Sequence, residues 1–309
     1  MSRGPDRLRF FTDGWGDQSA IDAAGIPSGD PLPLKIEWIS NTEQDGFGVS
    51  VGVFESPVVT LPEHARHGAV TRISPAGGAD RMVVLMAAWN EHDSRARFGI
   101  ARRLAQRGIA SLVLENPYYG IRRPTDHGGQ PIRTVADFFQ MGIGAVTEGR
   151  GLLATVRSEG LTPGVAGYSM GGNIAALVSS TMPFPVATAP LAASYSPAPV
   201  YLDGALRGGI DWAALGGESA AAPKLRETLL RASVFDRPSP AHARHAVMVS
   251  ARSDGYVPPA ATRALHAHWP GSELRWVGGG HATLLWMRKG VLATAIEDSF
   301  RRLTGTSRR

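Results

Sequence analysis

The chain has 309 residues, of which 43% are apolar and 19% charged, a composition that argues against disorder and provides for a sizeable buried core. It contains no cysteine, which excludes disulfide scaffolds, zinc fingers, iron–sulfur clusters and thiol nucleophiles. The formal charge of +5 arises mainly at the two ends, at Arg3, Arg7, Arg9, Arg308 and Arg309. The rest of the chain is nearly neutral, which argues against a nucleic-acid partner.

No targeting or membrane-spanning segment is evident, so we expect a cytoplasmic protein. Residues 1–14 lack the apolar core of a signal peptide. Residues 160–202 contain no charged residue and no histidine, but prolines interrupt them too often for a membrane helix. We interpret this uncharged stretch as the buried centre of the fold.

The predicted elements indicate a single domain over 1–309. Residues 1–75 form an N-terminal edge segment, in which strands at 35–39 and 48–54 pair antiparallel. Strands and helices then alternate, which predicts a doubly wound, mostly parallel sheet. The strands are expected at 82–87, 110–114, 164–167, 185–189, 246–250 and 273–277, and the helices at 94–108, 134–158, 170–181, 260–268 and 290–303.

Two stretches interrupt this regular pattern. The helix over 134–158 contains Gly142, Gly144 and Gly149, which we interpret as sites of close packing. Residues 191–245 are an insertion before the last two strands, and we predict that it forms a cap.

Gly167-Tyr168-Ser169-Met170-Gly171 fits the G-x-S-x-G motif, in which a sharp strand-to-helix turn presents a serine hydroxyl above the sheet. Glycines flank the serine because neighbouring backbones come too close for a Cβ atom. The motif lies where a predicted strand ends and a helix begins. Ser169 is therefore the candidate nucleophile.

A serine hydroxyl needs a base to take its proton, and the base needs an acid to orient it. Asp254 follows the strand at 246–250, and His281 follows the strand at 273–277. Both lie in loops at the carboxyl ends of strands, in the chain order Ser, Asp, His that this fold class uses. A turn residue and a solvated histidine are the alternatives.

The developing oxyanion requires two backbone N–H donors. We expect the first from Met170, at the start of a helix, and the second from Trp89 in the loop after 82–87. The alternative for Trp89 is that its side chain only packs against the substrate pocket.

No metal site or cofactor is predicted. The pairs His242 with His245 and His266 with His268, and the run 91–93, lack a spaced set of partner ligands. Neither a dinucleotide fingerprint nor a phosphate loop occurs.

Glu115-Asn116-Pro117-Tyr118-Tyr119-Gly120 is a more specific string, and with it the sequence resembles the alpha/beta-hydrolase-domain-containing protein 18 family. The resemblance extends from about residue 82 to 205 and includes 135–142 and 167–173. It implies an alpha/beta-hydrolase fold and a nucleophile at Ser169. Tyr118 and Tyr119 are candidate pocket residues, with a structural turn as the alternative.

Together these features predict a serine esterase or lipase-like hydrolase that acts on a hydrophobic or acyl ester of a small molecule or lipid. Two alternatives are an acyltransferase that uses the same triad and a noncatalytic hydrolase-like binding protein. The acyl and alcohol parts of the substrate and the oligomeric state do not follow from the sequence.

Overall fold

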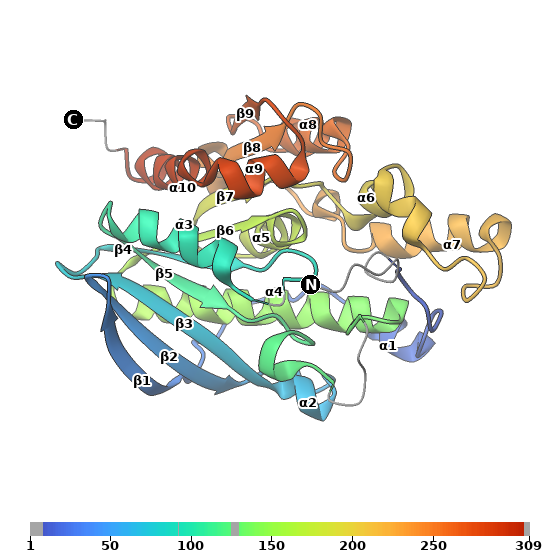
Figure 1. Ribbon diagram of the computed structural model, residues 1–309, viewed down its shortest axis with the longest axis horizontal. Helices are drawn as coiled ribbons and strands as arrows, with labels where there is room; N and C mark the ends of the chain where they lie inside the picture. Colours follow the sequence, from blue (N-terminus) through green and yellow to red (C-terminus); the bar gives the residue numbers. More distant parts are fainter. Residues whose placement is uncertain (1–8, 92, 125–129, 306–309) are drawn as a thin grey trace.

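The computed structural model describes residues 9–91, 93–124 and 130–305. His92 and the terminal arginines at 3, 7, 308 and 309 lie outside these residues. A nine-stranded sheet runs through the molecule in the order β1-β2-β3-β5-β4-β6-β7-β8-β9 (Figure 1). Its strands are β1 (Glu37–Gln44), β2 (Phe47–Glu55), β3 (His67–Pro75), β4 (Arg81–Met86), β5 (Ile109–Leu114), β6 (Thr162–Tyr168), β7 (Ala187–Leu191), β8 (Val247–Ala251) and β9 (Glu273–Val277).

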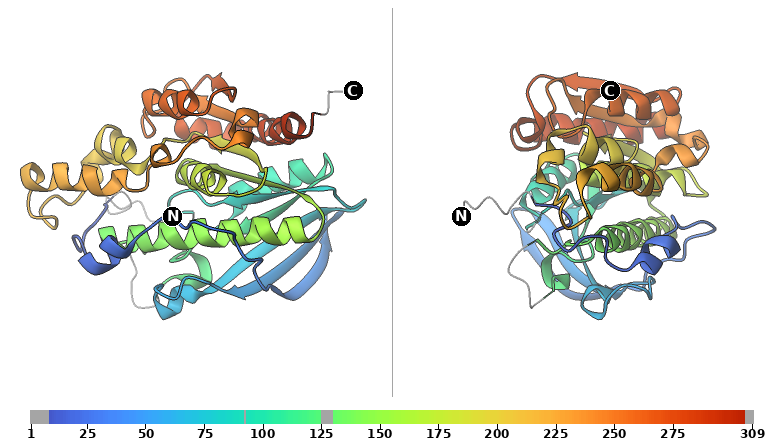
Figure 2. Two further views of the ribbon diagram at one scale, coloured as in Figure 1. Left: turned by 180° about the vertical axis from the view of Figure 1, so that it is seen from behind. Right: turned by 90° about the vertical axis from the view of Figure 1, so that its right-hand side faces the viewer.

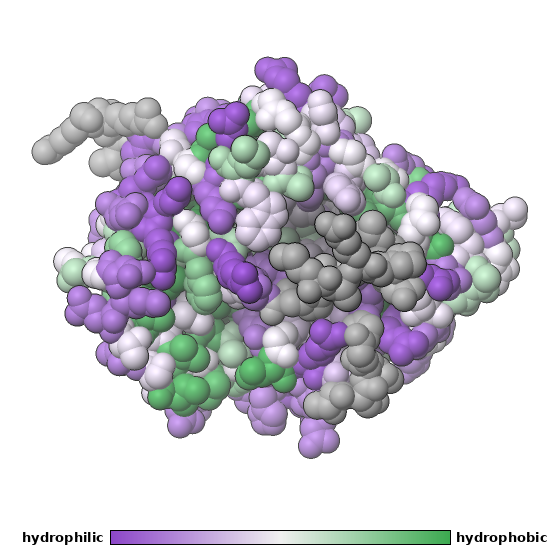
Figure 3. Space-filling view, in the orientation of Figure 1, coloured by the Kyte–Doolittle hydropathy of each residue, from purple (hydrophilic) through white to green (hydrophobic). Residues whose placement is uncertain are grey.

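The six strands from β4 onward are parallel, and β1 to β3 add an antiparallel edge. Of the two expected edge strands, the one at 48–54 is present with one more residue at each end, and the one at 35–39 begins two residues later and extends to Gln44. The strand β3 has no counterpart among the predicted elements. In Figure 3 hydrophobic residues gather at the lower left, over β1 to β3. The first five residues of β2 are all half-buried. This edge is less covered than the parallel strands β4 to β8, whose residues are almost all buried, and the other edge strand, β9, is half-buried throughout.

Helices cover both faces of the parallel strands (Figures 1 and 2). On one face α3 (Arg95–Ala105) and α10 (Lys289–Thr304) bury Leu104 and Phe300 against the sheet. On the other face α4 (Val135–Ser158), α5 (Met170–Ser180) and α8 (Pro259–His268) share a second core with the sheet. This sandwich is the doubly wound arrangement that the alternating sequence predicts.

Two local details differ from the sequence expectations. Ser94 stands at the start of α3, but its hydroxyl accepts a hydrogen bond from Arg97 rather than capping the helix. In α4, Cβ atoms at Gly144 and Gly149 would meet neighbouring side chains, as expected for close packing. At Gly142 nothing lies within 4 Å of such an atom, so close packing is not its role.

The insertion between β7 and β8 projects from one end of the molecule, beside α1 (Gln18–Ala23), in both Figure 1 and Figure 2. It contains α6 (Pro197–Leu202), α7 (Glu218–Leu230) and three short 3₁₀ segments, η3 (Ala205–Gly209), η4 (Val234–Asp236) and η5 (Ala241–His245). The remaining short elements are α2 (Glu63–Arg66), η2 (Gly120–Arg122) and α9 (His281–Met287).

Candidate active site

Ser169 occupies a sharp turn between β6 and α5, where its φ of 58° and ψ of −117° are rare for a residue with a side chain. Its N–H donates to the Leu191 carbonyl at 2.8 Å. A Cβ at Gly167 would lie 2.2 Å from the Gly171 oxygen, and one at Gly171 would lie 2.4 Å from the Met86 oxygen. Because backbone atoms cannot move aside, glycine is required on both sides of the serine.

Asp254 and His281 form a hydrogen-bonded pair. Asp254 lies in the turn after β8 with its side chain fully buried, and its Oδ2 accepts from His281 Nδ1 at 2.7 Å. The other oxygen, Oδ1, accepts from the N–H groups of Tyr256 at 3.0 Å and Val257 at 2.9 Å. His281 is the first residue of α9 rather than part of a loop as expected. The carboxylate is thus fixed on one side by backbone and faces the imidazole with the other.

Two tyrosine rings flank the His281 imidazole. The ring of Tyr168 lies 4.9 Å away and that of Tyr256 lies 5.3 Å away, between centroids. The Tyr168 hydroxyl donates to the His281 carbonyl at 2.6 Å, and burial raises the pKa of Tyr168, which keeps this donor protonated. These contacts fix the position of the imidazole independently of Asp254.

The Ser169 side chain has no hydrogen-bond partner among the described residues. The structure therefore joins His281 to Asp254 but does not show a hydrogen bond from Ser169 to His281. Catalytic hydrogen bonds of this kind often tighten only when substrate binds.

The backbone N–H groups of Met170 and Trp89, both near Ser169, have no acceptor among the described residues. Met170 is the first residue of α5, where N–H groups are free of intrahelical partners. The loop that carries Trp89 passes close to the serine turn, since a Cβ at Gly171 would lie 2.8 Å from the Ala87 oxygen. The Trp89 side chain also lines the pocket described next, and its role as the second oxyanion donor stays a prediction.

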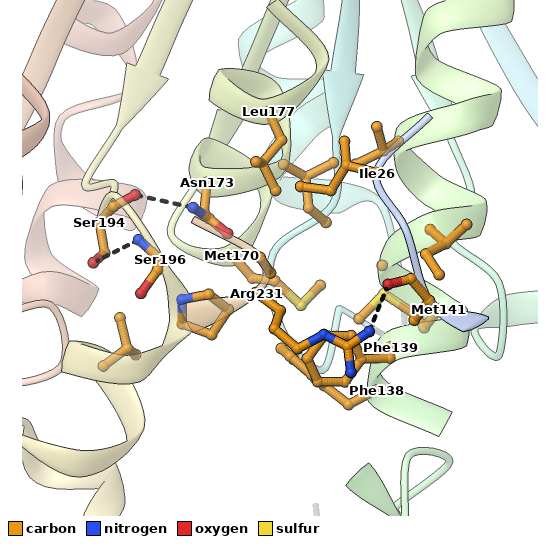
Figure 4. Close-up of a pocket in the computed structure, with 18 of the residues that line it drawn as sticks. Ile26, Phe138, Phe139, Met141, Met170, Asn173, Leu177, Ser194, Ser196 and Arg231 are labelled. Carbon is orange, nitrogen blue, oxygen red and sulfur yellow. Dashed lines mark hydrogen bonds between the residues drawn. The ribbon is translucent and has the colours of Figure 1, made fainter. Parts of the chain in front are cut away.

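A largely apolar pocket, partly open to solvent, adjoins Ser169 (Figure 4). It lies between α4 and α5, and the segment 24–27 and the insertion after β7 complete its walls. Its apolar lining includes Ile26, Phe138, Phe139, Met141, Gly142, Ile174, Leu177, Val200 and Leu206. The polar lining groups include Asn173, which donates to the Ser194 carbonyl at 3.1 Å, and Arg231, which donates to the Ala24 carbonyl at 3.2 Å.

Tyr118 and Tyr119 are not among the residues that line this pocket. Both are buried in a neighbouring aromatic core, where Tyr118 donates to Gln140 at 2.7 Å and Tyr119 accepts from the Asn90 N–H at 3.3 Å. The structural-turn alternative therefore describes them better, because Tyr118 has a positive φ of 70° inside the turn.

Sequence reasoning missed the pocket walls on α4 and at 24–27. One stretch of α4 carries Phe138, Phe139 and Met141. These apolar residues, next to the glycine at 142, are the sequence feature that could have indicated a pocket wall. The segment 24–27 is far from Ser169 in sequence and has no such signal.

Among the described residues no group of three or more His, Asp or Glu side chains is placed to hold a metal ion. His242 is buried, where its ring bonds to the Ser179 hydroxyl at 3.0 Å, and burial lowers its pKa to about 4. His266 and His268 bond to Ser272 and to the Arg237 carbonyl. These histidines have structural partners.

The architecture is that of an alpha/beta hydrolase, and the comparisons with known proteins agree. The model of the family "alpha/beta hydrolase domain containing 18" matches residues 8–235 and 226–302, so the chain belongs to this family. In the part of the chain that the structure describes, we find no helix with the length and apolar character needed to cross a membrane.

Solved structures share the fold at low sequence identity. An acetyl xylan esterase from Paenibacillus sp. R4 matches with a TM-score of 0.59 and 15% identity over 91% of this chain and 99% of its own. An S-formylglutathione hydrolase from Agrobacterium tumefaciens matches with a TM-score of 0.56 and 13% identity over 88% of this chain and 100% of its own. A cold-adapted esterase from an Arctic intertidal metagenomic library matches with a TM-score of 0.54 and 15% identity over 84% of this chain and 99% of its own.

Proposed function

We propose that this protein is a serine hydrolase that cleaves carboxylic esters bearing a hydrophobic group. Ser169 is the nucleophile, His281 the base and Asp254 the residue that orients the imidazole. The observation that carries the proposal is the His281–Asp254 hydrogen bond of 2.7 Å, next to a serine held at a strained φ of 58°. Tyr168, the residue before Ser169, joins the two by donating to the His281 carbonyl. A base that is oriented by a buried carboxylate is the arrangement that activates a serine nucleophile.

In the proposed reaction the Ser169 oxygen attacks the ester carbonyl carbon while its proton passes to Nε2 of His281. The N–H groups of Met170 and Trp89 stabilise the oxyanion, and its collapse expels the alcohol, which takes the proton from His281. Water then attacks the acyl-enzyme with His281 as base, and the acid and free Ser169 are released.

The apolar walls of the pocket support a hydrophobic substrate group. The aromatic side chains of Phe138 and Phe139 and the aliphatic side chains of Ile26 and Leu177 surround the space next to Ser169. Burial of a chain of methylene groups there contributes about 0.8 kcal/mol for each CH₂. We therefore expect kcat/KM to rise with acyl length until the pocket is filled.

Labelling with a fluorophosphonate probe, followed by peptide mapping, tests the proposal. Such a probe reacts with an activated serine and not with an ordinary one. We expect modification at Ser169, and turnover of p-nitrophenyl esters about 10⁴-fold lower in Ser169→Ala. Ser180→Ala is the matched control, because Ser180 lies at the far end of the same helix and bonds only to the Ala176 carbonyl.

Absence of labelling in the wild-type protein would contradict the proposal and favour a noncatalytic binding protein. Product analysis with added alcohols separates hydrolysis from acyl transfer, since a transferase yields a new ester instead of the free acid.

A further inference from the structure

The loop after β4 holds its successive N–H groups in different ways. The N–H of Ala88 donates to Oε2 of Glu91 at 3.1 Å, and the N–H of Asn90 donates to the Tyr119 hydroxyl at 3.3 Å. Between them, the N–H of Trp89 has no acceptor among the described residues. The loop thus anchors the amide on each side of Trp89 and leaves the middle one available.

A buried ion pair fixes the first anchor. Arg97 Nε donates to Glu91 Oε1 at 2.8 Å, and the two side chains are 7% and 9% exposed. The same guanidinium donates to the carbonyls of Leu85 and Leu114, at the ends of the neighbouring strands β4 and β5. A charge pair with this many hydrogen bonds has one well-defined geometry. Glu91 is therefore a rigid acceptor for the Ala88 N–H.

Tyr119 provides the second anchor from the loop after β5. Its side chain is buried, and burial raises the pKa of its hydroxyl, so the group remains neutral and accepts through a lone pair. The turn that places it is tight: Glu115 accepts the Ile121 N–H at 3.0 Å, and a Cβ at Gly120 would lie 1.7 Å from the Glu115 carboxylate. This packing explains the sequence string from Glu115 to Gly120.

The loop needs such anchors because its backbone is strained. Asn90 has a φ of 57°, in the left-handed region that asparagine tolerates better than most residues. If the Tyr119 hydroxyl were absent, the Asn90 N–H would lose its acceptor, and the peptide carrying the Trp89 N–H would be less well fixed.

We infer that Tyr119 is a positioning residue of the proposed hydrolase, which acts with the Glu91–Arg97 pair to aim the Trp89 N–H at the oxyanion. The inference rests on the proposed function of Ser169. Tyr119 touches neither the substrate pocket nor the reacting atoms, and its effect passes through the loop backbone. Binding of the uncharged substrate needs no fixed oxyanion donor, whereas the transition state does.

The test compares Tyr119→Phe with Tyr118→Phe. Each substitution removes one buried hydroxyl from the same turn, but the Tyr118 hydroxyl bonds to Gln140 at 2.7 Å and Asp137 at 3.4 Å, both on α4, and not to the loop. Complete loss of an oxyanion donor lowers kcat by about 10² to 10³. For a loosened donor we expect kcat to fall about tenfold in Tyr119→Phe with KM unchanged, and less than about twofold in Tyr118→Phe.

A trifluoromethyl ketone, which forms a tetrahedral adduct with an activated serine, provides a second measurement. Its inhibition constant is expected to rise in Tyr119→Phe by about the factor by which kcat falls, while that of the carboxylic acid product stays constant. Melting temperatures of the two variants are compared, because each loses the hydrogen bonds of one buried hydroxyl.

The outcomes separate the two proposals. If the fluorophosphonate probe does not label the wild-type Ser169, the proposed function fails. If it does, and the two variants have the same kcat and the same trifluoromethyl ketone affinity, the proposed function stands and the positioning role of Tyr119 is refuted.

Discussion

The substitution Asp254→Asn tests the proposed triad at the point where its geometry is best defined. Oδ1 of Asp254 accepts two backbone N–H groups, from Tyr256 and Val257, while Oδ2 accepts the His281 Nδ1–H. An asparagine must place its single oxygen toward the two backbone donors, because its NH₂ group cannot accept from them. The NH₂ group then faces Nδ1 of His281.

In that arrangement the imidazole carries its proton on the wrong nitrogen. Nδ1 becomes the acceptor for the asparagine NH₂, so Nε2 holds the proton and cannot accept one from Ser169. We expect kcat to fall by about 10⁴, which corresponds to about 5.5 kcal/mol of transition-state stabilisation. The fold is expected to persist, since both backbone hydrogen bonds to the side-chain oxygen remain.

Steady-state hydrolysis of a p-nitrophenyl ester measures this effect, with thermal unfolding as a check on the fold. Asp203→Asn is the control, because Asp203 forms an exposed ion pair with Arg226 at 2.6 Å. Exposed pairs contribute little, so activity and stability should stay close to those of the wild type. If a folded Asp254→Asn retains kcat within tenfold of the wild type, His281 does not depend on Asp254 for its tautomer, and the triad assignment is wrong.

Two further predictions concern stability. Burial lowers the pKa of His242, which is bonded to Ser179, from 6.5 to about 4, so the unfolded chain takes up a proton at a higher pH than the folded chain. As the pH falls from 6.5 to 4, the free energy of unfolding should therefore fall by up to about 3 kcal/mol. Urea titrations of His242→Gln should lack this pH-dependent component. In α4, Gly142→Ala should stabilise the protein by about 0.5–1 kcal/mol, because nothing lies within 4 Å of the added Cβ. Gly144→Ala should destabilise it, because the added Cβ would lie 2.7 Å from Pro117 Cγ. Equal melting temperatures of the two variants would contradict this prediction.

Several elements of the fold follow from local sequence patterns. Short apolar runs such as 82–87 and 110–114 coincide with buried strands to within one residue, because a strand covered on both faces has no polar side. The helix at 134–158 has the expected start, where Thr134 caps it through the Asp137 N–H at 2.9 Å. The strand β3 is not predicted because its apolar and polar residues alternate irregularly, although it pairs along its whole length with the preceding strand β2. Its second pairing, with β5 some forty residues later, is one that local pattern does not encode.

The amino-acid sequence alone indicates the family, through the string from Glu115 to Gly120, and the candidate residues Ser169, Asp254 and His281, through the glycine-flanked turn and the order of the three residues along the chain. Only the tertiary structure decided which groups these residues meet. The 2.7 Å bond between His281 and Asp254, the pocket wall from α4, and the contact of Tyr119 with the loop of Trp89 all join distant segments. They arise because parallel strands bring their carboxyl ends to one edge of the sheet, where loops far apart in sequence become neighbours.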